Sequence, residues 1–378
     1  MGKSRVGDKT DRSPGELQYF HWYDEPMGRR LQLDKSKVGE LLTRIESPDF
    51  ASSSTSEEKS KAHESLKDGA RNGLISVKRL LLICKVMDID SNSLERTGLF
   101  RRDYPISLRR PEIYKLMTHV INEGNASKGR KPDASYWNRD PSLLDRVSTL
   151  VESLGGKGHR AIGKDNVPVI EIDQTTGRAL IKAGLIPGKK ALGQYYHSLP
   201  DPMITEPKNS KYHLSGTFTE EGWTSLSIEK NERPRILVNY TRNIDVTGIV
   251  PRNLIDSMEA GEKLTVGRIP DEIEAEIRLN PFPLLENEIE MTQEMLGIPP
   301  RVNIVSLYKS SDQRITVEWR VTLSGPEEIA KLRDEIGFLP GSQAEERFEK
   351  IWQIFNEIKD KKLSEEDIES IKRELERT

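Results

Sequence analysis

The chain has 378 residues, of which 35% are hydrophobic and 31% charged, and its mean hydropathy is −0.63. This length allows two or three domains, whereas the longest purely aliphatic stretch, Leu80–Ile83, is far too short to span a membrane. The formal net charge of −3 argues against a protein that coats nucleic acid through bulk charge. Because Cys84 is the only cysteine and the N-terminal residues lack the apolar core of a signal peptide, we expect a cytoplasmic protein.

Charge is unevenly distributed along the chain. Between Arg96 and Lys211 there are 20 Lys and Arg against 12 Asp and Glu, whereas between Gly325 and Thr378 there are 10 against 15. A basic middle beside an acidic tail is typical of a protein in which one face meets phosphate and the rest stays solvated. Ordinary scatter of charges is the alternative explanation.

Residues 1–104 form an N-terminal region with three features. An aromatic cluster, Tyr19–Tyr23, is expected to anchor the tail to a partner that the sequence does not reveal. Ala51–Ser65 has almost no apolar residues and predicts a flexible linker. The segment 66–97 has apolar residues at helical spacing, followed by a polar turn, and predicts two helices. This pair is a candidate helix-turn-helix, although two short helices joined by a polar turn are also common.

From Arg110 onward the sequence repeats itself. A helix that starts with Pro111 carries apolar residues at i, i+3, i+4, i+7 and i+8 and ends at Glu123-Gly124. A second helix, which Ser210 is expected to cap, ends in the same way at Glu221-Gly222. The two endings lie 98 residues apart.

Two further pairs of segments follow in the same order. A helix that opens at Asp140-Pro141 and ends at Gly155 matches a later helix that ends at Gly297. Gly184-Leu-Ile-Pro-Gly188 likewise matches Gly337-Phe-Leu-Pro-Gly341. The offsets of 142 and 153 residues predict a duplicated unit whose second copy carries an insertion of about 44 residues, near 242–285.

Alternating segments between these helices predict antiparallel strands. They are Val167–Ile172 in the first copy and Thr224–Ile228, Arg235–Tyr240, Ile304–Tyr308 and Ile315–Leu323 in the second. Each copy therefore predicts the order helix, two strands, helix, two strands, helix, which is an α+β fold with helices on one face of each sheet. The segment 344–378 predicts a C-terminal helical extension whose apolar stripe packs on the core.

The two helix endings, Leu116-Met-Thr-His-Val-Ile-Asn-Glu-Gly124 and Leu214-Ser-Gly-Thr-Phe-Thr-Glu-Glu-Gly222, resemble the two motifs of LAGLIDADG (dodecapeptide, DOD-type) homing endonucleases. The segment Tyr136–Pro141 resembles the first half of archaeal members, and Ile336–Phe338 the end of their second half. The resemblance covers about residues 105–345. It implies a monomer that acts as a pseudo-dimer, with halves at 105–205 and 206–343 and two sheets that form a saddle over double-stranded DNA.

The resemblance also implies site residues. Glu123 and Glu221 take the place of the acids that bind Mg²⁺ or Mn²⁺ beside the scissile phosphates, together with the backbones of Gly124 and Gly222. The lysines that such enzymes carry near the end of each half correspond to Lys189 and Lys190 in the first half, and to Ser342 and Gln343 in the second. The two halves are therefore expected to be unequal.

The physics of a Glu-Gly helix ending agrees with a cation site. A carboxylate in the last turn faces the negative end of the helix dipole, at a cost of about 0.3–1 kcal/mol, and Gly124 and Gly222 are expected to form left-handed caps. A bound cation would relieve the repulsion. The alternative is that both glutamates are exposed helix ends without a ligand. Thr118 stands where the motif usually has a small residue, so close helix packing is expected on the Gly216 side only.

Basic residues that could line the phosphate-facing sheets are Arg139, Arg160, Arg178, Lys182, Lys208 and Lys211. The favoured hypothesis is a metal-dependent, site-specific DNA endonuclease. Because the chain opens with Met1 and has no splice-junction residues, we expect a free-standing protein rather than an intein. The alternative is a catalytically weakened nucleic-acid-binding protein, either a transcriptional regulator or an RNA maturation or processing factor.

Overall fold

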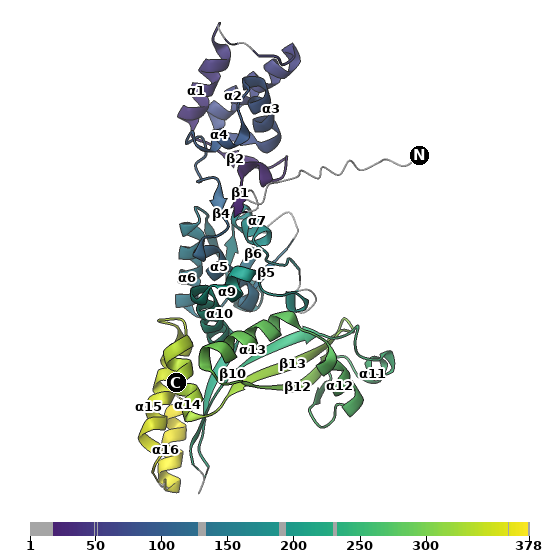
Figure 1. Cartoon of the computed structure of the whole chain (residues 1–378), viewed down its shortest axis with the longest axis vertical. Helices are drawn as coiled ribbons and strands as arrows, with labels where there is room; N and C mark the ends of the chain where they lie inside the picture. Colours follow the sequence, from purple (N-terminus) through teal and green to yellow (C-terminus); the bar gives the residue numbers. More distant parts are fainter. Residues whose placement is uncertain are drawn as a thin grey trace. The chain divides into compact units, whose positions relative to one another are not determined.

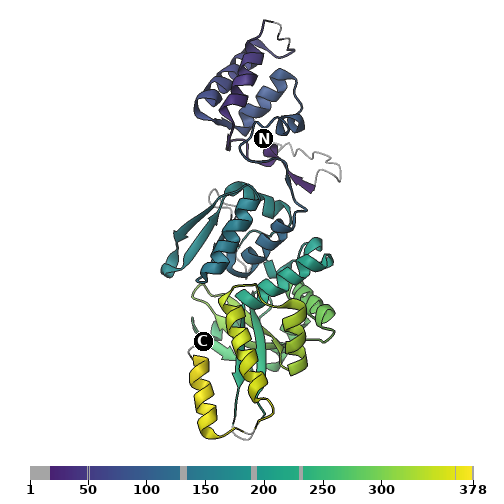
Figure 2. The same ribbon diagram turned by 90° about the vertical axis from the view of Figure 1, so that its left-hand side faces the viewer.

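The computed structural model describes residues 18–48, 50, 52–127, 134–188, 194–229, 233–361 and 363–376. The chain forms two compact units, which Figures 1 and 2 show from two sides. Unit 1 comprises residues 1–110 with 154–156, and unit 2 comprises residues 111–153 with 157–378. No helix in the described ranges is long and apolar enough to cross a membrane.

Unit 1 is a small helical unit with two short antiparallel ladders. Its helices are α1 (Lys35–Glu46), α2 (Ser56–Asn72), α3 (Val77–Met87) and α4 (Ser91–Glu95). Strand β1 (Tyr19–Phe20) pairs with β4 (Ile106–Ser107), and β2 (Arg30–Gln32) pairs with β3 (Leu74–Ser76). Leu66, Leu80, Ile83 and Leu94 are fully buried and bring α2, α3 and α4 into one core.

The predicted linker at residues 51–65 is wrong, because most of it belongs to α2. Thr55 caps this helix: its hydroxyl accepts from the Glu58 amide, and the Glu58 carboxylate accepts from the Thr55 amide. The buried face of α2 is made largely of small residues such as Ala62 and Gly69, so its composition looks like that of a linker. The Thr55–Glu58 spacing was the available sequence signal.

The aromatic cluster has its partner in α4. Trp22 is fully buried, stacks on Phe100 and donates from Nε1 to the Ser91 carbonyl at 3.1 Å, while the Tyr23 hydroxyl donates to Asn92 at 2.8 Å. These contacts cover the first turn of α4, which is only five residues long. The second helix of the predicted helix-turn-helix is therefore short and partly covered by the aromatic cluster, and DNA recognition by this pair stays a prediction.

Unit 2 contains two halves with the same topology. In the first half, α5 (Pro111–Glu123) and α6 (Pro141–Ser153) accompany a sheet of order β5-β6-β8-β7. Its strands are β5 (Gly124–Ala126), β6 (Ala134–Trp137), β7 (Gly158–Ile162) and β8 (Pro168–Ile172), followed by α7 (Gln174–Lys182). The short helices η3 (Lys164–Asn166), η4 (Gln194–Tyr196) and α9 (Asp201–Thr205) lie in the connections.

The second half repeats this order with one added strand. Its sheet runs β11-β12-β13-β10-β9, with β9 (Gly222–Ser227), β10 (Arg235–Asp245), β12 (Arg301–Lys309) and β13 (Ile315–Leu323) in the places of the first half's four strands. Its helices are α10 (Pro207–Glu220), α13 (Pro283–Leu296), α14 (Pro326–Lys331) and the π-helical turn η5 (Leu332–Ile336). The α+β fold and the duplication predicted from the sequence are confirmed.

The insertion is shorter than predicted. It spans residues 246–282, because β10 continues to Asp245 and α13 begins at Pro283. It contains α11 (Arg252–Ser257), β11 (Lys263–Thr265) and α12 (Asp271–Leu279), and β11 pairs with β12 to extend the sheet by one strand. Figure 1 shows α11 and α12 at one end of this sheet.

Two helix boundaries differ from the predictions. Helix α10 begins at Pro207, and Ser210 lies inside it with its hydroxyl donating to the Ile204 carbonyl at 2.8 Å, so Ser210 is not the cap. Gly124 and Gly222 do not have positive φ and are not left-handed caps. Each begins a strand directly. A Cβ on Gly124 would lie 2.5 Å from the Ser135 carbonyl oxygen, and one on Gly222 would lie 2.2 Å from the Phe218 carbonyl oxygen.

The C-terminal extension packs on the second sheet. Helices α15 (Gln343–Ile358) and α16 (Glu365–Glu376) bury the predicted apolar stripe: Phe348, Ile351, Phe355 and Ile358 are at most 6% exposed. Ile354, Ile358 and Ile368 form one cluster with Ile228, just past the end of β9. The extension therefore covers the edge of the second sheet, as Figure 2 shows.

Candidate nucleic-acid interface

The two motif helices α5 and α10 pack side by side at the junction of the halves. Their backbones approach closely at Gly216, where an added Cβ would lie 2.5 Å from Cγ2 of Thr118. The methyl group of Thr118 thus occupies the space that glycine leaves on the opposite helix. The expected loss of close packing at Thr118 is wrong, since one small residue is enough to bring these two helices together.

Polar side chains fill part of the interface between α5 and α10. His119 is fully buried, with Nδ1 2.5 Å from Oε1 of Glu220 and Nε2 2.9 Å from the hydroxyl of Tyr212. Tyr136 donates to the same Glu220 oxygen at 2.6 Å. Burial, followed by the charge of Glu220, raises the pKa of Tyr136 far above its usual value. His119 is a core residue, and the carboxylate of Glu220 is engaged by three partners, His119, Tyr136 and Asn122.

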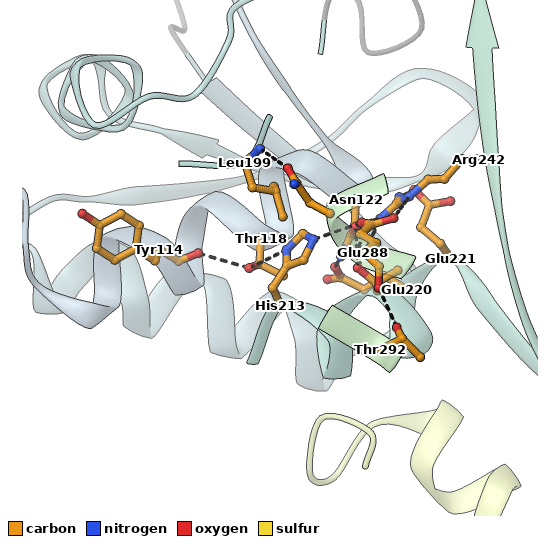
Figure 3. A network of polar contacts seen from close by, with 12 residues as sticks. Tyr114, Thr118, Asn122, Leu199, His213, Glu220, Glu221, Arg242, Glu288 and Thr292 are labelled. Atoms are coloured by element: carbon orange, nitrogen blue, oxygen red, sulfur yellow. Dashed lines mark hydrogen bonds and ion pairs between the residues drawn. The ribbon is translucent and has the colours of Figure 1, made fainter. Parts of the chain in front are cut away.

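A second buried network centres on Arg242 and Glu288 (Figure 3). Arg242 donates from Nε to Oε2 of Glu288 at 3.0 Å and from Nη2 to Oε1 at 2.5 Å, and both side chains are fully buried. Nε2 of His213 lies 3.0 Å from the same carboxylate, and Nη2 of Arg242 also donates to Asn122 on α5 at 2.9 Å. This network connects both motif helices to β10 and α13.

The charges in this network hold one another in the ionised state. Burial alone would raise the pKa of Glu288, but Arg242 and His213 together hold it at about 2. Burial alone would lower the pKa of Arg242, but Glu288 is the first of several groups that raise it well above its usual value. A buried cation of this kind stays charged at every physiological pH.

The same guanidinium also faces the second motif acid. Nη1 of Arg242 lies 3.3 Å from Oε1 of Glu221, whose side chain is 21% exposed. Figure 3 shows the two side chains next to each other at the end of α10. The charge of Glu221 is therefore partly offset by a guanidinium that it shares with Glu288.

The first motif acid has a different environment. Glu123 lines a hollow of about 730 Å³ at the ends of α5 and α10. Its lining includes Trp137, Arg139, Lys164, Trp223 and Arg347. Asp140 lies in the same hollow, but its carboxylate accepts from Ser142 and from the backbone amide of Gln343. The two motif acids are thus not equivalent.

These residues do not fit a metal centre built on both acids. A cation bound to Glu221 would face the guanidinium of Arg242, while Glu220 and Asp140 are engaged by donors from the protein. Across the described ranges, no three His, Cys, Asp or Glu side chains gather where they could hold a metal ion. Gly124 and Gly222 lie in ladders, opposite Tyr136 and Tyr240.

The lysine positions implied by the resemblance are only partly visible. Lys189 and Lys190 lie outside the described residues. Ser342 is the N-cap of α15 and accepts from the Glu345 amide. Gln343 lines the hollow beside Glu123. In the second half the place of the lysine is therefore taken by the start of the C-terminal extension.

The six basic candidates do not line the open faces of the sheets. Arg178 and Lys182 lie on α7, and Lys208 and Lys211 lie in the first two turns of α10. Arg160 lies opposite Ile170 on the helix-covered side of its sheet and pairs with Asp145 of α6. Arg139 follows β6 and lines the hollow of Glu123.

Sequence reasoning missed the open face of the second sheet. Strand register places one set of alternating residues on the side away from α13. The basic, amide and aromatic members of this open face are Arg235, Arg301, Arg320, Lys263, Asn239, Asn243, Asn303, Trp223 and Tyr308. A hollow of about 460 Å³ lies on it. The alternation within Ile315–Leu323 carried this signal, since each polar residue of this strand lies between two buried ones.

The open face of the first sheet is chemically different. Register with Val169 and Glu171 of β8 places His159, Ala161, Ser135 and Trp137 on this side. The four strands are described throughout, and none of their residues on this face is Lys or Arg. The two halves therefore share a topology, but the open faces of their sheets carry different side chains.

Comparison with known proteins gives matches in structure only. No family model matches the chain, and no curated protein matches it by sequence. Solved structures that match include full-length DUF199/WhiA from Thermatoga maritima (11% identity, TM-score 0.34, 71% of this chain and 67% of that one). The LAGLIDADG meganuclease I-AabMI bound to uncleaved DNA also matches (12%, 0.39, 69% and 96%), as does the LAGLIDADG homing endonuclease I-LtrWI bound to target DNA (13%, 0.38, 70% and 96%). A further match is the N-terminal LAGLIDADG domain of DUF199/WhiA (10%, 0.31, 65% and 90%).

Proposed function

We propose that this chain binds double-stranded DNA, with the open face of the second sheet as its main contact surface. The observation that carries the proposal is the composition of this face, in which Arg, Lys and Asn side chains alternate with buried residues along four strands. Arginine and lysine suit guanine edges and phosphates, and asparagine suits adenine edges.

The spacing of this face also suits a duplex. Residues two apart on a strand lie about 6.8 Å apart, which is about twice the 3.4 Å rise along one DNA strand. Arg301 and Asn303 on β12 are both exposed and have this separation. Trp223 and Tyr308 are 36% and 41% exposed, and the guanidinium of Arg320 stacks 5.0 Å above the Trp223 ring. These planar groups can pack on sugars and bases.

The acids on this face are neutralised locally. Glu318 pairs with Lys263 at 2.9 Å and accepts from Ser306 at 3.0 Å. Asp245 accepts from the Thr247 amide at 2.9 Å and lies 3.9 Å from Arg314. The face therefore does not repel phosphate strongly.

Selection of duplexes from a random pool, followed by titration of the full chain at several salt concentrations, tests the proposal. We expect a preferred DNA duplex whose affinity falls steeply with salt. Equal binding to all sequences, no binding to duplex DNA, or preference for an RNA would contradict it.

A second candidate function is metal-dependent hydrolysis of DNA by the same chain, with Mg²⁺ or Mn²⁺ as the cofactor. It is favoured by the position of Glu123, which lines a hollow together with Arg139, Lys164 and Arg347. Glu221 lies 3.3 Å from the guanidinium of Arg242, so we infer that Glu123 is the acid better suited to such chemistry.

Incubation of supercoiled plasmid carrying the selected site with Mg²⁺ or Mn²⁺ separates the two candidates. A binding protein leaves the plasmid supercoiled, whereas hydrolysis that depends on Glu123 gives a nicked circle that the Glu123→Gln variant does not produce. Cleavage of both strands at equal rates would show that Glu221 supports hydrolysis as well as Glu123 does, and would contradict the inferred difference between the two acids.

A further inference from the structure

Unit 1 carries a groove with a strong excess of positive charge. Two adjoining hollows, of about 630 and 290 Å³, share Asn72 and Leu74 as lining residues. We call them together the basic groove, after the cations that line them: Arg30, Lys35, Lys78, Arg79 and Arg101. The only acid in the lining is Asp68.

Most of these cations have no protein counter-ion. Asp68 lies 3.5 Å from Arg79, so its charge is already balanced. Arg30, Lys35, Lys78 and Arg101 are exposed and form no ion pair with any residue that the structure describes. By contrast, Lys61 and Lys85 elsewhere in unit 1 pair with Glu57 and Glu58. Four unpaired cations in one groove leave a local field that attracts a polyanion.

The backbone strengthens this field. Arg30 on β2 lies opposite Ser76, the N-cap of α3. The amides of Val77 and Lys78 donate to the carbonyls of Arg29 and Met27, and the first turn of α3 contains Lys78 and Arg79 but no acid. Basic residues at the positive end of a helix are unfavourable unless an anion lies there. The composition favours a polar ligand over an apolar one, since Met27 and Leu74 are the only large apolar side chains in the lining.

We propose that the basic groove is a second nucleic-acid contact, which binds the phosphate backbone of duplex DNA without reading its sequence. The choice of DNA rests on the proposed function of unit 2, whereas the groove itself belongs wholly to unit 1. Phosphates recur along each strand, so an elongated groove with several cations can hold more than one of them.

The test compares two variants of the full chain that lose the same charge. Arg30→Gln with Lys78→Gln removes two cations from the basic groove, and Lys59→Gln with Lys61→Gln removes two from α2 outside it. For the groove variant we expect a several-fold loss of affinity for any duplex, and a salt slope smaller by up to about 2. The control variant should match the parent chain. A further variant, Lys35→Gln with Arg101→Gln, should repeat the effect in the adjoining hollow.

The outcomes separate the two proposals. If the parent chain binds no duplex at all, the function proposed for unit 2 fails. If the parent binds and both groove variants keep its affinity and salt slope, the DNA contact in unit 1 is refuted. Loss of sequence preference in a groove variant would also contradict the proposal, since phosphate contacts lower the affinity for all sequences alike. Thermal unfolding that matches the parent ensures that the variants are folded.

Discussion

The guanidinium of Arg242 and the carboxylate of Glu288 form a two-point ion pair inside unit 2, with Nε 3.0 Å from Oε2 and both side chains fully buried. The pair stands where β10 and α13 meet the two motif helices. Ion pairs of this kind contribute little net stability, but removal of one partner leaves a buried, uncompensated charge. This relationship makes the core of unit 2 sensitive to a single substitution.

Replacement of Arg242 by Met is expected to destabilise the protein by about 3–5 kcal/mol, because Glu288 loses its counter-charge in the interior. The double variant Arg242→Met, Glu288→Leu should recover most of this loss, because no charge then remains buried. Urea unfolding of the parent, the single and the double variant measures the effect. An Arg242→Met variant as stable as the parent chain would show that the charge of Glu288 is neutralised in another way.

Stability at acid pH should depend on the same pair. The pKa of Glu288 is lowered from 4.5 to about 2 in the folded chain, so the unfolded chain takes up its proton first as the pH falls. The pH-dependent part of the stability that results from this lowered pKa, about 3 kcal/mol, is therefore fully present above pH 4.5 and is lost as the pH falls towards 2. Unfolding free energies between pH 2 and 6 should fall less steeply in the Arg242→Met, Glu288→Leu variant. Equal slopes would show that other carboxylates dominate.

Gly216→Ala is expected to destabilise unit 2 by about 1–3 kcal/mol, because the new Cβ would lie 2.5 Å from Cγ2 of Thr118. Thr118→Ser removes that methyl group and keeps the hydroxyl that donates to the Tyr114 carbonyl, so the double variant should be more stable than Gly216→Ala alone. Gly39→Ala on α1 is the control, since its Cβ would meet nothing within 4 Å. Thermal unfolding of the two single variants, the double variant and the control checks this, and additive effects of Gly216→Ala and Thr118→Ser would contradict the contact.

Arg301→Gln should weaken DNA binding, because Arg301 is exposed on the open face of the second sheet. If its side chain contacts a phosphate, the salt slope should also fall by about one. Arg160→Gln removes an equal charge from the helix-covered side of the first sheet, where Arg160 pairs with Asp145, and should have little effect. Titrations of the selected duplex at several salt concentrations compare them. A larger effect at Arg160 would place the interface elsewhere.

Local patterns in the sequence were sufficient to predict the duplicated architecture. Helix periodicity, the Glu-Gly endings and the paired Gly-Leu-Ile-Pro-Gly and Gly-Phe-Leu-Pro-Gly segments depend on neighbouring residues, and the structure confirms the repeated order of helices and strands. Helix α2 escaped prediction because its buried face consists mostly of small residues, which resemble a linker in composition.

The environment of the motif acids depends on contacts between distant residues and could not be predicted in this way. Arg242 reaches Glu221 and Glu288 only because β10 continues for five residues past Tyr240. The side chain of Arg242 lies on the buried face of β10, the same face as Val238 and Tyr240. A cation at a strand position that faces the core predicts a buried acid as its partner, but the sequence alone does not identify which acid.

The difference between the two open faces bears on what kind of target the protein would recognise. The two halves of unit 2 share a topology, but the cations lie on the open face of the second sheet, whereas the strands of the first present Asn125, Glu171, His159 and Trp137. A protein with matched faces suits a palindrome and can bind it in either direction. With unmatched faces only one direction of docking is favourable, so the recognised sequence should be non-palindromic, with its most restrictive positions in one half.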